Sequence, residues 1–374
     1  MHVSFWERES FYNDIDYAII GSGIVGLSAA VELKNKYPNA KVLIFEKGFL
    51  PSGASTKNAG FACFGSPTEI LDDLSIMSEV EVFAMVEKRW KGLLNLKELI
   101  GEDNLGLETL GSCELFTNED ETIYQNTIEK LAYLNDFLRP IFNEDVFELK
   151  DELIAEFGFG NINHIIYNRF EGQINTGKAL KYLLDLAKIK GVEFFNGVEV
   201  KNLNQKKEIV QIELQEFNIE AKNVLVATNG FAKQILPELN VEPARAQVLI
   251  TEPIEGLKLK GTFHYEQGYY YFRNVGNRVL FGGGRNLDKE AENSLEIKLT
   301  STIQNKLDQL LEEVILPYKS DVKVKMRWAG IMGVGDTKTT IVKQLDANIY
   351  CAVRMGGMGI AIGSLIGKEA AGLI

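Results

Sequence analysis

Three glycines near the start of the chain have the spacing of a phosphate-binding turn. They lie in Gly21-Ser22-Gly23-Ile24-Val25-Gly26. In this pattern the first glycine makes a tight turn and the second lets the backbone approach a pyrophosphate. The third lets a helix pack closely on a strand. Glu46 follows about 20 residues later, where a carboxylate accepts hydrogen bonds from an unphosphorylated ribose. The pattern predicts a dinucleotide site.

The segments around these glycines favour the same interpretation. Residues 15–20 are a short apolar run, typical of a buried parallel strand. Residues 24–36 carry apolar side chains at helical spacing and stop at Tyr37-Pro38. Residues 41–46 predict a second strand. Together they form a strand–helix–strand unit whose helix points its free N–H groups at the phosphates.

Similar elements return later in the chain, separated by segments of another kind. Residues 72–142 are helical in pattern, with breaks expected near 101–106 and at Pro140. Residues 244–284 are rich in strand patterns. We therefore expect an α/β chain (α+β overall) of two interleaved domains. An FAD/NAD-binding Rossmann-like domain with a central parallel sheet takes residues 1–70, 171–240 and 335–374. A substrate domain, built on a mostly antiparallel sheet plus helices, takes residues 71–170 and 241–334.

Composition excludes several other classes of protein. The formal net charge is −12 over 374 residues, and no basic stripe interrupts it, so a nucleic-acid partner is not expected. The three cysteines and three histidines are scattered, which argues against a metal site. The start of the chain lacks the apolar core of a signal peptide, and the weakly polar run 355–367 is too short to span a bilayer. These features predict a cytoplasmic protein without a transmembrane segment.

Five later segments carry a family resemblance. They are 52–61 (SGASTKNAGF), 223–230 (NVLVATNG), 279–285 (VLFGGGR), 327–331 (RWAGI) and 354–367 (RMGGMGIAIGSLIG). In this order and spacing they resemble the D-amino-acid oxidase family of FAD-dependent oxidoreductases, which includes glycine oxidase and monomeric sarcosine oxidase. The first segment resembles the flavin-contacting loop of that family, and the last resembles its C-terminal glycine turn beside the flavin.

The resemblance implies that the dinucleotide is FAD. It also implies non-covalent binding, since the turn 331–336 lacks the cysteine by which some relatives attach flavin. The helix after the glycine turn would point its N-terminus at the flavin and stabilise the anionic reduced ring. The residues expected to contact FAD are Gly21, Ser22, Gly23, Ile24, Val25, Gly26, Glu46, Lys47, Ala54, Ser55, Lys57, Asn58, Ala59, Gly60, Val198, Ala227, Thr228, Gly230, Gly330, Arg354, Gly356, Gly357, Met358, Gly359 and Ile360.

The family's usual residues for binding a substrate carboxylate are missing. Met332 and Ala361 stand where the resemblance implies an arginine or a lysine. The substitutes that we name as candidate catalytic or substrate-binding residues are Arg354, Tyr270, Arg273 and Lys57. Packing or surface roles remain open for each of them.

The resemblance implies oxidation of a C–N bond in an amine or an N-substituted amino acid. Hydride passes to the flavin, the imine hydrolyses, and oxygen or another acceptor reoxidises the flavin. Two alternatives remain open: a dehydrogenase of a hydroxy acid or polyol that passes electrons to a quinone, and a flavin-binding subunit that needs a partner. The sequence leaves the oligomeric state open.

Overall fold

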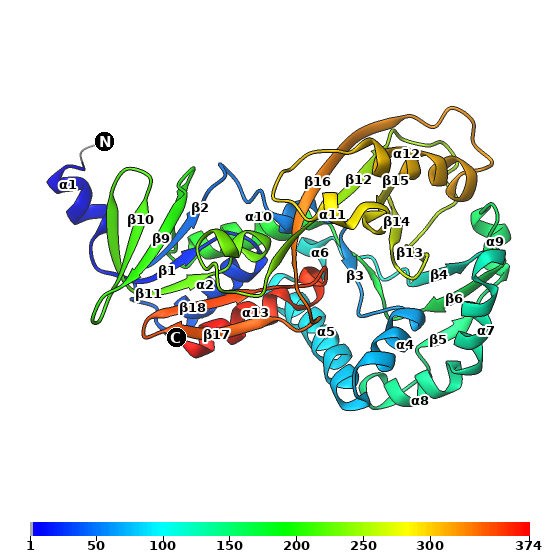
Figure 1. The fold of residues 1–374 in the computed structure, drawn as a ribbon, viewed down its shortest axis with the longest axis horizontal. Helices are drawn as coiled ribbons and strands as arrows, with labels where there is room; N and C mark the ends of the chain where they lie inside the picture. Colours follow the sequence, from blue (N-terminus) through cyan, green and yellow to red (C-terminus); the bar gives the residue numbers. More distant parts are fainter. Residues whose placement is uncertain (1–2) are drawn as a thin grey trace.

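The structure is a computed structural model that describes residues 3–374. The strands of this part of the chain form two eight-stranded sheets and one two-stranded sheet. In Figure 1 the first large sheet lies on the left and the second on the right. Helices α5 (Glu79–Ile100) and α13 (Gly359–Leu373) lie between them in this view.

The first sheet has a parallel centre in the order β18-β11-β1-β2-β8. Strand β17 and the hairpin β9-β10 extend it with antiparallel pairs. The strands are β1 (Ile15–Ile20), β2 (Val42–Glu46), β8 (Glu193–Asn196), β9 (Val200–Gln205), β10 (Val210–Leu214), β11 (Asn218–Val226), β17 (Ile341–Asp346) and β18 (Ile349–Val353). Ile20 pairs with both Phe45 and Val226. The turns that follow these strands therefore meet at one edge of the sheet, where ligands of such sheets bind.

Helix α2 (Ile24–Lys36) lies between this sheet and other helices. All residues from Ile24 to Val31 are buried, because α13 and α10 (Thr176–Ile189) also contact α2. A Cβ on Gly363 would lie 2.5 Å from Ile24 Cγ2, and one on Gly367 would lie 2.5 Å from the Val25 carbonyl oxygen. Part of the glycine-rich C-terminal segment therefore serves close helix packing.

The second sheet is antiparallel except for one pair. Its order is β16-β12-β15-β14-β13-β4-β6-β5, and only β13 and β4 run parallel. The strands are β4 (Ser112–Phe116), β5 (Phe147–Leu149), β6 (His164–Asn168), β12 (Glu242–Thr251), β13 (Thr262–Tyr265), β14 (Tyr270–Val275), β15 (Arg278–Gly283) and β16 (Val324–Val334). The expected fold class, a parallel sheet combined with a mostly antiparallel one, is confirmed.

The remaining elements connect and cover the sheets. They are α1 (Phe5–Glu7), a π-helix (Arg8–Tyr12), α3 (Ala54–Lys57), β3 (Phe61–Ala62), α4 (Pro67–Ile76), α6 (Glu102–Leu105), α7 (Glu121–Glu129), α8 (Leu131–Phe142), α9 (Glu152–Phe157), β7 (Gly172–Gln173), α11 (Lys289–Glu292), α12 (Ser301–Leu310) and a second π-helix (Leu311–Ile315), with 3-10 turns at Asn118–Asp120, Asn229–Gln234 and Arg285–Asp288. Pro140 lies inside α8. The expected break at Pro140 comes two residues early, since α8 continues to Phe142 although the proline offers no N–H to the preceding turn.

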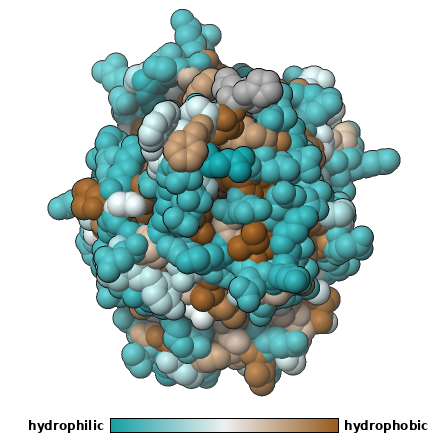
Figure 2. Space-filling view, turned by 90° about the vertical axis from the view of Figure 1, so that its left-hand side faces the viewer, coloured by the Kyte–Doolittle hydropathy of each residue, from teal (hydrophilic) through white to brown (hydrophobic). Residues whose placement is uncertain are grey.

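The two large sheets take their strands from alternating parts of the chain. The first draws on residues 15–46, 193–226 and 341–353, and the second on residues 112–168 and 242–334. The division into an FAD-binding domain and a substrate domain with the bounds given above remains a prediction. The end of the molecule that carries the first sheet is mostly hydrophilic, with apolar side chains in separate patches (Figure 2). Among the described residues, no helix is both long and apolar enough to cross a membrane.

Candidate functional site

A cavity of about 730 Å³ is lined by residues of both large sheets. This volume is typical of a site for a small molecule or cofactor. The expected cofactor residues that line it are Gly21, Gly23, Ile24, Val25, Glu46, Lys47, Ala54, Ser55, Lys57, Asn58, Ala59, Gly60, Val198, Ala227, Thr228, Gly330, Gly356, Gly357, Met358, Gly359 and Ile360. Ser22, Gly26, Gly230 and Arg354 do not line it.

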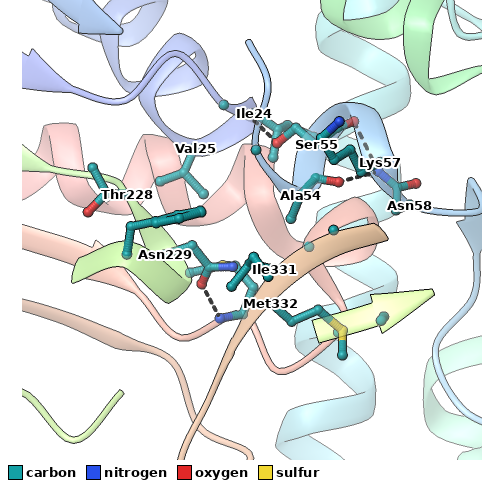
Figure 3. A pocket seen from close by; sticks show the side chains of 18 of the residues that line it. Ile24, Val25, Ala54, Ser55, Lys57, Asn58, Thr228, Asn229, Ile331 and Met332 are labelled. Carbon is teal, nitrogen blue, oxygen red and sulfur yellow. Dashed lines mark hydrogen bonds between the residues drawn. The ribbon is translucent and has the colours of Figure 1, made fainter. Parts of the chain in front are cut away.

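The N-terminus of α2 forms one wall of the cavity. Gly21 has a φ of 104°, and a Cβ there would lie 2.9 Å from the Ala227 carbonyl oxygen. The backbone N–H of Ile24 donates to Ser55 Oγ at 3.0 Å, which ties the loop after β2 to this helix end (Figure 3). The first turn of a helix has backbone N–H groups without intrahelical partners and a positive dipole end, so this wall suits a phosphate group.

Glu46 lies beside this wall at the end of β2. Its Oε2 accepts hydrogen bonds from the Ser22 backbone N–H at 3.1 Å and from Ser22 Oγ at 2.6 Å. Its Oε1 accepts from the backbone N–H of Gly48 at 2.9 Å. The carboxylate is therefore fixed toward the cavity and retains lone pairs for ribose hydroxyls. The expected FAD contact of Ser22 is corrected, since Ser22 does not line the cavity and instead holds the Glu46 carboxylate by these hydrogen bonds.

Two of the expected glycines act through packing. A Cβ on Gly26 would lie 2.0 Å from the Gly21 carbonyl oxygen, and one on Gly230 would lie 2.4 Å from the Met332 carbonyl oxygen. Their role as direct cofactor contacts is corrected. They allow the walls of the cavity to come together, as the fingerprint requires of its third glycine.

The loop after β2 is folded tightly around α3. The Asn58 side-chain amide donates to the carbonyl oxygens of Ala54 and Ser55, and Asn58 Oδ1 accepts from the Gly60 backbone N–H (Figure 3). The carbonyl oxygen of Lys57 accepts from Trp328 Nε1 at 3.0 Å. A Cβ on Gly330 would lie 2.8 Å from the Lys57 Cβ. The loop thus joins the two sheets at the middle of the cavity.

The C-terminal glycine turn forms the facing wall. Gly356 and Gly357 have φ angles of 56° and 85°, and α13 begins at Gly359. Asn229, at φ 48°, accepts hydrogen bonds from the backbone N–H groups of Arg354 and Met355, both at 3.1 Å. The structure therefore links this turn to the turn after β11. Left-handed backbone at consecutive positions favours glycine, which lets main chain lie close to a ligand.

Arg354 is buried away from the cavity. Its guanidinium donates to the Thr339 and Asn240 carbonyl oxygens and to the hydroxyls of Thr337 and Thr339. The guanidinium of Arg354 therefore does not contact substrate, and a flavin contact of this residue stays a prediction. The guanidinium donates to the loop between β16 and β17 and to Asn240 just before β12, and the sequence does not show that these segments meet.

Tyr270 faces the opposite side of the second sheet. It is fully buried in the core with Phe281 and Phe272, and burial raises its pKa to about 12. Its neighbours Tyr269 and Tyr271 line the cavity. The prediction for Tyr270 is wrong by one position, because side chains alternate between the faces of a strand.

Arg273 is buried beneath the cavity wall and does not line it. Its Nη2 donates to the Ile174 carbonyl oxygen at 3.0 Å. Burial lowers its pKa to about 10. The prediction of a substrate contact for Arg273 is corrected to a link between β14 and the segment before α10.

Part of the cavity lining carries two ionisable side chains that the sequence interpretation missed. Glu69 and His264 line the cavity together with the aromatic rings of Phe61, Tyr269 and Tyr271. Burial opposes ionisation of Glu69, yet the charge of His264 and the backbone N–H of Ser66 hold its pKa below the usual value. Burial also opposes protonation of His264, yet Glu171, Glu69 and Glu114 raise its pKa. His264 Nε2 lies 3.8 Å from Glu171 Oε2.

Comparisons with known proteins agree with this geometry. A profile of the family described as FAD dependent oxidoreductase (DAO) matches residues 16–373. The chain belongs to this family. A probable oxidoreductase, OrdL, of Haemophilus influenzae is 24% identical over 94% of this chain and 81% of its own length. Glycine oxidase of Geobacillus kaustophilus is 25% identical over 71% of this chain and 69% of its own length. The crystal structure of L-proline dehydrogenase from P. horikoshii has the same fold, with a TM-score of 0.76, 19% identity, and coverage of 97% of this chain and 94% of the other.

The cofactor of this FAD-dependent oxidoreductase is FAD. The cavity fits it in three observed ways: a helix N-terminus for the pyrophosphate, a fixed carboxylate for the ribose, and a left-handed glycine turn for a flat ring. Cys63 also lines the cavity, and burial raises its pKa well above the usual value. A neutral thiol is a poor nucleophile, so non-covalent binding remains the prediction.

Several residues of this DAO-family site were not named as expected contacts. Those that line the cavity and were not expected include Phe61, Glu69, Asn229, His264, Tyr271, Arg285, Asn286, Lys289, Ile331 and Met355. Phe61, Asn229, Arg285, Ile331 and Met355 lie within the segments that carry the family resemblance, so the sequence could have indicated them. The others lie outside those segments and meet only through the tertiary fold.

The stability of the protein is expected to fall with rising pH because of Glu114. Burial raises the pKa of Glu114 from 4.5 to about 7, although Ser66 and Thr68 donate hydrogen bonds to it. A group whose pKa is higher in the folded than in the unfolded protein stabilises the fold fully at pH values below its unfolded pKa. That stabilisation is lost as the pH rises through the folded pKa. Because of this group, we expect the free energy of unfolding to fall by up to about 3 kcal/mol between pH 4.5 and pH 8. Glu114→Gln should flatten the fall, as measured by urea denaturation at several pH values.

The matched control is Glu129→Gln at the exposed end of α7. It should leave the pH dependence of stability as it is in the native protein. Equal slopes for Glu114→Gln and the native protein would contradict the prediction.

Proposed function

We propose that the protein oxidises the C–N bond of an amine or an N-substituted amino acid. The substrate loses two electrons and a proton equivalent from the carbon next to nitrogen, the product imine hydrolyses, and oxygen or another acceptor takes up the electrons. FAD, when bound, supplies the hydride acceptor. The residues of the chain bind the substrate, exclude water and accept the proton of its ammonium group.

The observation that carries this proposal is the charged and aromatic end of the cavity. Glu69 stays ionised there, since its pKa is held low, and a carboxylate at a cavity wall attracts an ammonium group. An amine must lose its proton before the neighbouring carbon can give up a hydride. The ionised Glu69 lines the wall where such a proton can be accepted, while His264, whose pKa is raised, keeps that carboxylate ionised. Phe61 and Tyr271 pack edge to face and enclose this end with apolar surface.

Names among the similar proteins support the same donor class. Glycine oxidase and L-proline dehydrogenase are named for amino acids, and a further structure of the same fold is an iminodiacetate oxidase. A more distant relative is named L-2-hydroxyglutarate dehydrogenase. A hydroxy acid has no positive charge to match Glu69, so we favour the amine.

The test is an anaerobic visible spectrum of the FAD-loaded protein with paired donors. Each amine or N-substituted amino acid is compared with the hydroxy acid of the same carbon skeleton. We expect at least one amine to bleach the oxidised flavin band and its hydroxy counterpart to leave the band unchanged. Bleaching by hydroxy acids alone would reject the proposal in favour of a hydroxy-acid dehydrogenase.

A further inference from the structure

Two polar atoms at the end of β15 are buried without a partner. Nε of Arg285 and Oδ1 of Asn286 form no hydrogen bond with any residue of the described part of the chain. Both residues line the cavity. Buried polar atoms are nearly always paired, because an unpaired one loses its hydration without compensation. A ligand in the cavity is therefore the natural partner.

The backbone brings these residues to the cavity by a glycine turn. Gly283 and Gly284 have φ angles of 131° and 75°, and the Gly284 backbone N–H donates to the Tyr269 carbonyl oxygen at 3.0 Å. A Cβ on Gly283 would lie 2.2 Å from the same oxygen. The end of β15 is thus pressed against Tyr269, and the chain turns there into the segment that starts at Arg285.

The guanidinium of Arg285 is fixed in place. Its Nη2 donates to Asn293 Oδ1 at 2.5 Å. Asn293 directly follows α11, whose Glu292 is buried and bound by Arg245 through two hydrogen bonds of 2.9 Å. Arg245 takes the close hydrogen bonds of Glu292, which acts on Arg285 only through its charge, and no described carboxylate is hydrogen-bonded to the Arg285 guanidinium. Burial lowers the pKa of Arg285 against the opposing charge of Glu292.

A second positive charge lies beside it. Lys289 lines the cavity, and its Nζ lies 5.8 Å from the centroid of the Tyr269 ring. Met332 and Ala361 also line the cavity but provide no charge. Glu69, by contrast, lies against Gly268, where a Cβ would be 3.4 Å from its carboxyl carbon.

We infer that Arg285, with Lys289 beside it, binds the carboxylate of the substrate. An arginine fork recognises a carboxylate with parallel hydrogen bonds. The unpaired Oδ1 of Asn286 is an acceptor, so it suits an N–H group of the same substrate. The substrate is then an amino acid, with its carboxylate at Arg285 and its nitrogen toward Glu69. The inference rests on the proposed function, because it names the acid half of the same substrate.

The test uses equilibrium binding to the oxidised holoenzyme, so turnover is not needed. Benzoate is titrated into the FAD-loaded protein while the visible flavin spectrum is recorded, with neutral benzamide as the matched probe. We expect benzoate to bind and Arg285→Met to weaken its binding about 10- to 100-fold. Benzamide should bind the native protein and Arg285→Met equally. Arg278→Met, at the start of β15 and bonded to Thr251 and Glu252 outside the cavity, should leave benzoate affinity unchanged.

A second variant protects the test against a folding defect. Arg285→Lys keeps the positive charge but removes the parallel N–H donors of the guanidinium, so we expect about a fivefold loss of benzoate affinity. Unchanged affinity in both variants, or no saturable binding of benzoate to the native protein, would overturn the inference. Benzoate binding that depends on Arg285, in a protein whose flavin no amine reduces, would instead reject the proposed function alone.

Discussion

Replacing Gly26 by alanine is expected to weaken FAD binding by about 100-fold or more. The new Cβ would lie 2.0 Å from the Gly21 carbonyl oxygen and 3.2 Å from Ile19 Cγ2. These neighbours are backbone and buried core, so α2 must move away from β1. That movement displaces the N–H groups that face the pyrophosphate. The measurement is the FAD dissociation constant of apoprotein titrated with FAD, followed by flavin fluorescence.

Gly372→Ala is the matched control for this substitution. Gly372 lies exposed near the end of α13, where a Cβ would meet only Lys36 Nζ at 3.9 Å. It should bind FAD as the native protein does. If Gly26→Ala also retained native FAD affinity, the close contact of α2 with the turn at Gly21 would not determine cofactor binding.

Glu292→Gln is expected to destabilise the protein by about 3–5 kcal/mol. Arg245 has an exposed fraction of 0% and Glu292 of 1%, so the substitution leaves a buried guanidinium without its counter-charge. Burial opposes ionisation of Glu292, yet hydrogen bonds from Arg245 and Gln247 hold its pKa below the usual value. The pair joins β12 to α11 and thereby fixes the segment that carries Arg285. The measurement is the urea midpoint with FAD in excess.

The control removes a charge from an exposed pair. Asp145 and Arg139 are joined at 2.6 Å, with side chains that are 59% and 49% exposed. Asp145→Asn should cost less than about 1 kcal/mol, because water screens such pairs. A Glu292→Gln midpoint that matched the Asp145→Asn midpoint would show that the buried pair adds no more than a surface one.

Local sequence determined the dinucleotide-binding unit. The expected helix 24–36 has the bounds of α2, and the expected strands 15–20 and 41–46 agree with β1 and β2 to within one residue. The signals are local: glycines that alone tolerate the turn, a continuous apolar strand, and the stop at Tyr37-Pro38. Such features need no information from distant parts of the chain.

The local sequence did not determine which side chains of the second sheet face the cavity. Tyr269, Tyr270 and Tyr271 are three similar residues in a row, and both faces of β14 are covered by apolar neighbours. No alternation between polar and apolar residues marks the cavity side, so the choice of Tyr270 over Tyr271 could not be made. In the same way, only the tertiary path of the 335–340 loop and of the segment at Asn240 decides that the Arg354 guanidinium donates its hydrogen bonds away from the cavity.

The family, the cofactor and the wall that holds its phosphates thus follow from short motifs, because a glycine turn and a ribose carboxylate act within a few dozen residues of one another. The substrate end depends on the tertiary structure. Glu69 comes from α4, His264 from β13 and Arg285 from the turn after β15. Their meeting depends on how α4 and strands β13 and β15 pack together, and long-range packing of that kind leaves no periodic trace in any one segment.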